Sequence, residues 1–189
     1  MEVLCATGVP VQTLHRNLFQ GPHAHRMGDG FGQTAQQYDQ RIAKLSGMPF
    51  SPTYKQNILQ NDDEILDSGM TARAAALVRP LGAKAEMSLA YRLQVARFIE
   101  GISASDPQPV VTALQDFYPG WTEIQLLQKL NADTTITLTA VMAKKASAIS
   151  KQRGVQGVPT LIRHLKGEPE VIDVGRFYHS PDTITGLIY

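Results

Sequence analysis

Cysteine is nearly absent from this sequence, whose 189 residues contain only Cys5. A single cysteine cannot form a disulfide within the chain or a cysteine-rich zinc site, so both means of stabilisation are excluded. Net charge is also almost absent, because 18 Lys and Arg residues oppose 17 Asp and Glu residues. General binders of nucleic acid or of anionic membranes carry a concentrated excess of basic residues, so this balance argues against both classes.

Long apolar runs and targeting signals are missing as well. No run approaches the roughly 18 apolar residues of a membrane-spanning helix. The first eight residues have neither a basic flank nor an apolar stretch, as a targeting segment would. A lone unpaired cysteine fits a reducing compartment, so we predict a cytoplasmic protein. A hydrophobic content of 43% indicates a folded domain rather than disorder.

The first zone of the chain, residues 1–31, has one strand signature. Residues 9–14 alternate apolar and polar side chains, which predicts a strand. Residues 2–8 end in glycine and resemble the last turn of a helix with a glycine cap. Residues 15–22 end in Gly-Pro and are predicted to be a loop.

The middle zone, residues 32–153, is predominantly helical by its apolar spacing. We expect helix starts after Asp106 and at Thr122, and a solvated loop rather than a metal site at the acidic run 61–64. Further helices are predicted over residues 35–46, 54–59, 70–78, 85–99, 109–117, 124–130 and 134–153. Four aromatic residues are expected in the core of this zone, namely Tyr38, Tyr54, Tyr91 and Phe98. Trp121 is expected to anchor a helix start.

The third zone, residues 154–189, returns to β character. Residues 158–163 and 170–174 are apolar runs joined by a turn, which predicts a hairpin. Ser180 followed by Pro181 has the chemistry of a helix start, so a last helix is expected. Together the zones predict an α+β domain that carries a large helical insertion.

Five sequence motifs narrow the fold further. Residues 154–161 (GVQGVPTL), at the end of a long helix and the start of a hairpin, resemble the cis-proline segment of thioredoxin-fold proteins of the DsbA branch. Other segments resemble DsbA/FrnE-type predicted protein-disulfide isomerases, namely 14–21 (LHRNLFQG), 39–50 (DQRIAKLSGMPF), 65–68 (ILDS) and 97–101 (RFIEG). The resemblance spans essentially the whole chain.

The resemblance implies an α+β (α/β) fold, with a thioredoxin-like sheet and a large all-helical DsbA-type insertion. Residues 1–31 and 154–189 would form the thioredoxin-like subdomain. Residues 32–153 would form the helical insertion subdomain, including the long helix that leads back to the sheet.

One departure from the family is as informative as the match. The family fold begins with a strand, followed by Cys-x-x-Cys at the start of the first helix, where the helix dipole favours a thiolate. This sequence has no counterpart of either feature, and Cys5 lies instead at the end of the predicted helix tail. We therefore assign no catalytic residue and expect the thioredoxin-like subdomain to lack about 30 residues, one strand–helix portion.

Three explanations of the departure remain open. The sequence comes from a truncated gene or a misassigned start, or the protein is a homologue that has lost the redox motif. Alternatively, a partner chain completes the sheet, whose strands would otherwise present unpaired edges.

The proline loop provides the candidate peptide site. A cis bond between Val158 and Pro159 would leave the main-chain N–H and C=O of Val158 free to pair with an extended peptide. In the family this loop faces the dithiol and holds the substrate, so the resemblance implies that Val158, Pro159 and Thr160 bind peptide. The alternative is an ordinary trans proline at the start of a strand.

Other polar residues receive structural interpretations. His23 and His25 have no carboxylate or cysteine in register, so we expect a solvated loop and no metal site. His15 is expected to be packed or solvent-facing, and Arg26 and Arg41 to be surface or salt-bridge residues.

Two functional hypotheses follow, and neither requires a bound cofactor. The first is a thiol–disulfide oxidoreductase or protein-disulfide isomerase of the DsbA family that is redox-inactive in this chain because Cys-x-x-Cys is absent. The second is a non-catalytic, thioredoxin-like module that binds peptides or acts as a scaffold. A lesser alternative is a relative of the kappa-type glutathione transferases and hydroxychromene carboxylate isomerases. The expected partners are unfolded or extended proteins, and a second copy or partner chain at the sheet, with no nucleic acid or membrane.

Overall fold

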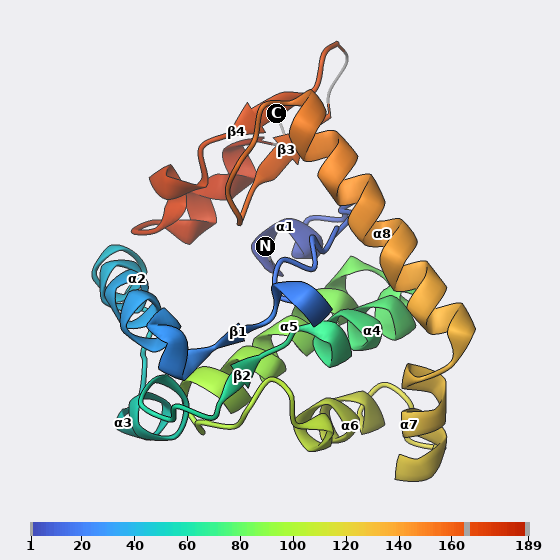
Figure 1. The fold of residues 1–189 in the computed structure, drawn as a ribbon. Helices are drawn as coiled ribbons and strands as arrows, with labels where there is room; N and C mark the ends of the chain where they lie inside the picture. The colour runs from blue at the N-terminus through green and yellow to red at the C-terminus, as the bar shows by residue number, and fades with distance from the viewer. Residues whose placement is uncertain (1, 165–166, 188–189) are drawn as a thin grey trace.

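A computed structural model describes residues 2–164 and 167–187. Most of these residues are helical, and the longest helix, α8 (Asp133–Gln152), runs along one side of the molecule (Figure 1). It connects the helical part of the chain to the hairpin of strands β3 and β4 near the C-terminus. Within the described ranges, no helix has the length and apolarity that crossing a membrane requires.

The helices predicted in the middle zone are all present. Their bounds are α2 (Phe31–Ser46), α3 (Pro52–Tyr54) with the π-helix Lys55–Leu59, α4 (Gly69–Val78), α5 (Ala83–Phe98), α6 (Pro107–Gln115), α7 (Glu123–Leu130) and α8. Short 3-10 turns precede α2 at Gly21–His23 and Met27–Asp29, and another lies between α4 and α5 at Arg79–Leu81.

The predicted start signals operate as expected. The Asp106 side chain accepts a hydrogen bond from the Gln108 amide at 2.8 Å and so begins α6. Thr122 and Gln125 form a reciprocal capping box at the start of α7. Trp121, just before that box, stacks on Tyr118 with ring centroids 4.6 Å apart, which confirms its role as an anchor.

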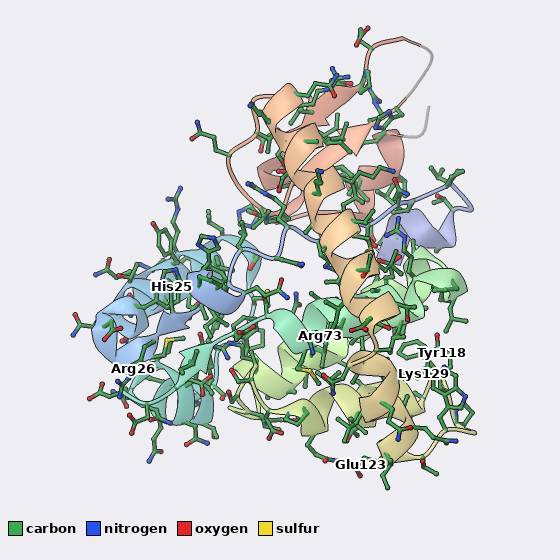
Figure 2. The ribbon with its side chains drawn as sticks, turned by 45° about the vertical axis from the view of Figure 1, so that its right-hand side comes forward. His25, Arg26, Arg73, Tyr118, Glu123 and Lys129 are labelled. Atoms are coloured by element: carbon green, nitrogen blue, oxygen red, sulfur yellow. The ribbon has the colours of Figure 1, made fainter. Side chains whose placement is uncertain are left out.

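The main core lies where α4 meets α5, α6, α7 and α8. Alanine occupies most of the buried positions of α4, so the neighbouring helices approach its backbone closely. The fully buried members of this core are Ala74, Val78, Leu89, Val110, Val111, Leu114, Leu126 and Leu130. Figure 2 shows one edge of this bundle, where Tyr118 and Lys129 lie on the opposite side of the molecule from His25 and Arg26.

A second, aromatic core lies beneath α2 and α3. Tyr54 and Phe98 pack in an edge-to-face arrangement with centroids 5.2 Å apart, as their predicted core positions require. The same prediction is wrong for Tyr38 and Tyr91, which are 62% and 63% exposed. Tyr38 lines a surface hollow between α2 and the segment that contains Gly175 and Tyr178, and Tyr91 lines the groove between α5 and α6.

The two ends of the chain share a third core. Strands β3 (Leu161–Arg163) and β4 (Glu170–Ile172) form the predicted antiparallel hairpin, with Leu161 opposite Ile172. Part of the predicted turn, residues 165–166, lies outside the described residues. Helix α1 (Glu2–Ala6) packs on the final 3-10 helix (Pro181–Leu187), which replaces the predicted last α-helix. The buried residues of this core are Leu4, Ile172, Phe177 and Ile184, with the 3-10 turn Val174–Phe177 beside them.

The predicted strand over residues 9–14 is wrong, because the segment has no strand assignment in the structure. A strand requires a ladder of main-chain hydrogen bonds with a neighbour, and β3 pairs only with β4 in the described residues. The alternation nevertheless reflects packing, since Val11 contacts the core shared by the chain ends. An unpredicted two-residue strand, β1 (His25–Arg26), pairs with β2 (Ile65–Leu66).

Candidate functional site

The proline loop follows directly from the end of α8. Gly154 closes the helix with a left-handed φ of +64°, and the Val155 amide donates to the Ser150 carbonyl at 2.9 Å. Residues 156–160 then lead to the start of β3 and are all exposed. The loop is therefore held between a long helix and the hairpin, while its own surface faces solvent.

Val158 is the central residue of the exposed segment 156–160. Its side chain is 54% exposed, and the bond to Pro159 is cis. The Thr160 hydroxyl donates to the Gly157 carbonyl at 2.8 Å, which ties the two ends of the short turn together. Across the described ranges, neither the N–H nor the C=O of Val158 bonds to another main-chain group. The loop can therefore offer both groups to an extended peptide.

The segment after residues 9–14 braces the loop from one side. Nη1 of Arg16 donates to the carbonyl oxygen of Gln156 at 3.3 Å. The preceding residue, His15, lies with Nε2 3.6 Å from Oε2 of Glu86. His15 was predicted to be packed or solvent-facing, and it is half-buried.

Glu86 is the buried centre of this brace and was not singled out in the sequence. Its side chain is 4% exposed, and Nη1 of Arg79 lies 3.8 Å from Oε1. The Thr13 hydroxyl donates to the carboxylate, while Arg79 donates to the Thr13 carbonyl at 2.9 Å. Because a buried carboxylate requires such partners, Glu86 fixes residues 13–15 against α5. Helical periodicity gave no signal for this role, since the partners come from a distant loop.

The histidine pair of the N-terminal zone belongs to a different region. The ring of His25 stacks on that of Phe31, with centroids 4.4 Å apart, while His23 is exposed. Among the described residues, no group of three or more His, Cys, Asp or Glu side chains is placed to hold a metal ion. Arg26 forms an exposed ion pair with Asp63, and Arg41 is exposed on α2, so both are surface residues as predicted.

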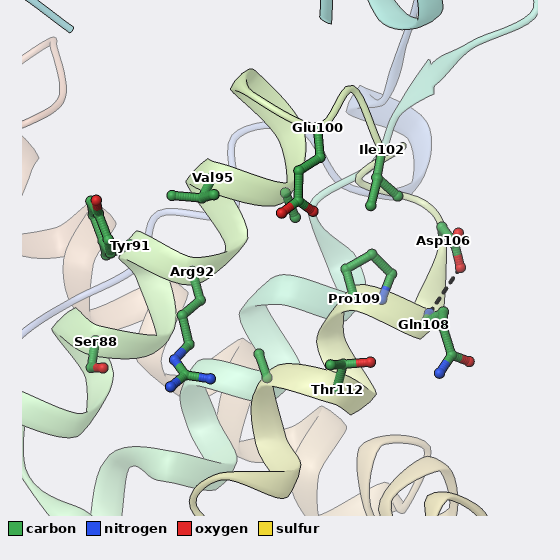
Figure 3. Close-up of a pocket in the computed structure, with 12 residues that line it drawn as sticks. Ser88, Tyr91, Arg92, Val95, Glu100, Ile102, Asp106, Gln108, Pro109 and Thr112 are labelled. Carbon is green, nitrogen blue, oxygen red and sulfur yellow. Dashed lines mark hydrogen bonds between the residues drawn. The ribbon is translucent and has the colours of Figure 1, made fainter. Parts of the chain in front are cut away.

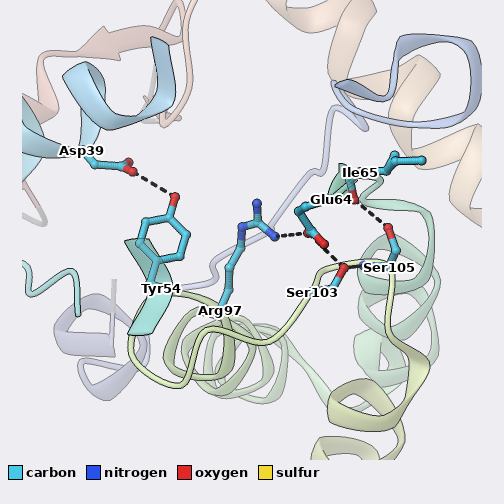
Figure 4. A network of polar contacts seen from close by, with 7 residues as sticks. All are labelled: Asp39, Tyr54, Glu64, Ile65, Arg97, Ser103 and Ser105. Atoms are coloured by element: carbon cyan, nitrogen blue, oxygen red, sulfur yellow. Dashed lines mark hydrogen bonds and ion pairs between the residues drawn. The ribbon is translucent and has the colours of Figure 1, made fainter. Parts of the chain in front are cut away.

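The acidic run 61–64 includes one buried residue, so the prediction of a solvated loop is wrong for Glu64. Its side chain is 7% exposed, and Nη1 of Arg97 lies 3.3 Å from Oε1 (Figure 4). Ser103 donates to the same oxygen at 2.9 Å. Residues 61–63 of the run are exposed, and only Glu64 is buried, where Arg97 of α5 provides the opposite charge.

A second polar contact lies beside this ion pair. The Tyr54 hydroxyl donates to Oδ2 of Asp39 at 2.9 Å (Figure 4). Burial raises the pKa of Asp39, although the hydrogen bond from Tyr54 and the charge of Arg97 act in the opposite direction. Burial, followed by the charge of Asp39, also raises the pKa of Tyr54. These contacts join α2, α3 and α5 and are structural.

A surface groove lies between α5 and α6 and has a volume of about 670 Å³. Val95, Ile102 and Pro109 contribute apolar lining, and Arg92 and Glu100 contribute charged side chains (Figure 3). The guanidinium of Arg92 forms an ion pair with Asp116. None of the residues that line this groove belongs to the proline loop, so the two features are separate.

Cys5 belongs to helix α1, and its side chain is not among those that the structure describes. The remaining sequence contains no second cysteine. The site as described therefore consists of the main chain of the proline loop and the basic segment that braces it.

Comparison with known proteins supports this arrangement at the level of the fold. No protein-family model and no curated protein matches the sequence. A solved structure of the cytosolic disulfide reductase DsbM from Pseudomonas aeruginosa superposes with a TM-score of 0.80 at 19% identity, over 99% of this chain and 88% of that chain. The same reductase solved with GSH gives a TM-score of 0.75 at 20% identity, with the same coverage. The predicted fold class is confirmed: this chain has a DsbA-like, mixed α+β thioredoxin fold with a large helical insertion.

Proposed function

We propose that this protein is a DsbA-like member of the thiol–disulfide oxidoreductases that binds extended polypeptide at Val158, Pro159 and Thr160. The single observation that carries the proposal is the unpaired main chain of Val158 on an exposed loop, within a fold shared with a disulfide reductase. Main-chain pairing gives affinity with little dependence on sequence, as an enzyme acting on many unfolded proteins requires.

The 189-residue chain is proposed to be redox-inactive by itself. Disulfide exchange through a dithiol needs two cysteines, because the second thiolate must resolve the mixed disulfide formed by the first. With only Cys5 present, the chain would act as a peptide-binding module or scaffold. A cytoplasmic location and the absence of a resident cofactor belong to the same proposal.

A second candidate is a glutathione-using relative of the kappa-type transferases. The observation that favours it is the solved neighbour with GSH. Glutathione is itself a short peptide with a main chain, so it could occupy the same loop. The two candidates differ in ligand size rather than in the place of binding.

Binding is tested by titrating a short, unstructured, acetylated peptide into the labelled protein and following amide resonances by NMR. We expect shifts at residues 156–160 and none in the groove between α5 and α6. N-methylation of one central peptide amide should weaken binding about three- to tenfold, because it removes one main-chain hydrogen bond. Exchanging peptide side chains should change the affinity less. Shifts confined to the α5–α6 groove, or full affinity after methylation at every position, would refute the proposal.

Redox inactivity is tested by insulin reduction. We expect the parent chain to give no turnover above that of Cys5→Ser. Clear activity that disappears in Cys5→Ser would show that Cys5 is a catalytic nucleophile.

A further inference from the structure

Arg16 is a basic residue beside the proline loop, and its charge has no acidic partner among the described residues. Its Nη1 contacts the Gln156 carbonyl, two positions before Val158. A two-residue extended segment spans about 7 Å, so the Arg16 guanidinium lies within about 10 Å of the Val158 main chain. A ligand paired with Val158 would therefore pass close to it.

The guanidinium retains most of its hydrogen-bonding capacity. A guanidinium carries five N–H donors, of which the structure uses one, on the Gln156 carbonyl. Nε of Arg16 is buried, and it has no hydrogen-bond acceptor in the part of the chain that the structure describes. Nε is therefore closed to a ligand, whereas Nη2 is not buried and forms no hydrogen bond with a described residue, so Nη2 and the second N–H of Nη1 can donate to an incoming oxygen ligand.

The nearby buried acid does not satisfy Arg16. Glu86 already accepts a hydrogen bond from Thr13 and lies within ion-pair distance of Arg79 and His15. Among the described residues, no carboxylate lies within ion-pair distance of Arg16. The buried Glu86 carboxylate is thus already paired with Arg79 and Thr13, whereas the Arg16 guanidinium can bind an anion.

We propose that Arg16 binds the terminal carboxylate of a short extended peptide whose main chain pairs with Val158. This inference rests on the proposed peptide-binding function of the proline loop and adds the ligand class. The guanidinium of an arginine donates two parallel hydrogen bonds to the two oxygens of a carboxylate. A backbone carbonyl has one oxygen and cannot accept this pair of bonds. The site therefore prefers small peptides, or chain ends, over internal segments of a long polypeptide.

The experiment compares two forms of one short acetylated peptide, ending in a free carboxylate or in a carboxamide. Dissociation constants are measured by NMR titration with the parent chain, Arg16→Gln and Arg16→Lys. Arg26→Gln is the matched control, because Arg26 lies in an exposed ion pair beside α2, away from the loop (Figure 2). We expect the parent and the control to bind the carboxylate form about tenfold more tightly than the amide, as a charge-assisted bidentate contact implies.

Arg16→Gln should remove this preference, so that the carboxylate and amide forms bind with equal affinity, and Arg16→Lys should restore only part of the preference. If the parent binds both forms equally at residues 156–160, the role of Arg16 is wrong and the peptide site stands. If the parent binds neither form, both proposals are wrong. A weaker affinity of Arg16→Gln for both forms alike would show that Arg16 only supports the loop, which also overturns the inference.

Discussion

Replacing Arg97 by methionine tests whether the helical part of the fold depends on a single buried ion pair. The Glu64 and Arg97 side chains are 7% and 12% exposed, and Nη1 lies 3.3 Å from Oε1. Arg97→Met keeps most of the side-chain volume but leaves the Glu64 carboxylate without a counter-charge. Removing one partner of a buried pair costs about 3–5 kcal/mol, because the other charge stays desolvated.

We expect the lower end of that range for Arg97→Met, about 3 kcal/mol. Ser103 still donates to Oε1 at 2.9 Å, so the carboxylate retains one hydrogen bond. The measurement is the free energy of unfolding from urea titration, followed by circular dichroism.

The matched control is Arg26→Met, which breaks an ion pair whose partners are 51% and 87% exposed. Solvent screens such a pair, so a loss below about 1 kcal/mol is expected. The double variant Arg97→Met/Glu64→Met should recover part of the loss, because replacing both charges by apolar groups removes the uncompensated one. Equal costs for Arg97→Met and the control would refute the assignment of Glu64 as a buried, charged partner.

Two further predictions concern stability. The raised pKa of Asp39 means that the folded state binds a proton more tightly than the unfolded state, so stability should fall as pH rises from the ordinary value of 3.8 through the raised one. Asp39→Asn keeps an acceptor for Tyr54 and should lack this decline in urea titrations between about pH 4 and 6, whereas parallel pH profiles would contradict the assignment. Leu126→Ala should cost about 2–5 kcal/mol, since Leu126 is fully buried, while Ile124→Ala on the same helix, 69% exposed, should change stability by less than about 0.5 kcal/mol. Comparable losses in thermal melts of these two variants would refute the placement of α7.

The order of helices and the hairpin could be predicted because their signals are local. Asp106 and Thr122 satisfy amide groups within three residues of themselves, so the sequence alone contains both partners. The same holds for the glycine that ends α2, where Gly47 has a φ of +70°. The proline loop was likewise located by its motif, at the boundary between a helix and a strand.

Contacts between distant segments could not be predicted in this way. Residues 9–14 have the alternation of a strand, but a strand exists only where a neighbour completes its hydrogen bonds. Nothing local in the sequence distinguishes Glu64 and Glu86 from surface acids. The packing of α5 brings Arg97 to Glu64. The turn after α4 brings Arg79 to Glu86, and the N-terminal segment brings Thr13 to it. The sequence by itself determined the helices of the middle zone, the hairpin and the proline loop, because the signals for them are close in the chain. Tertiary structure decided which polar groups are buried, and it placed Arg16 beside Gln156, because those partners are 140 residues apart.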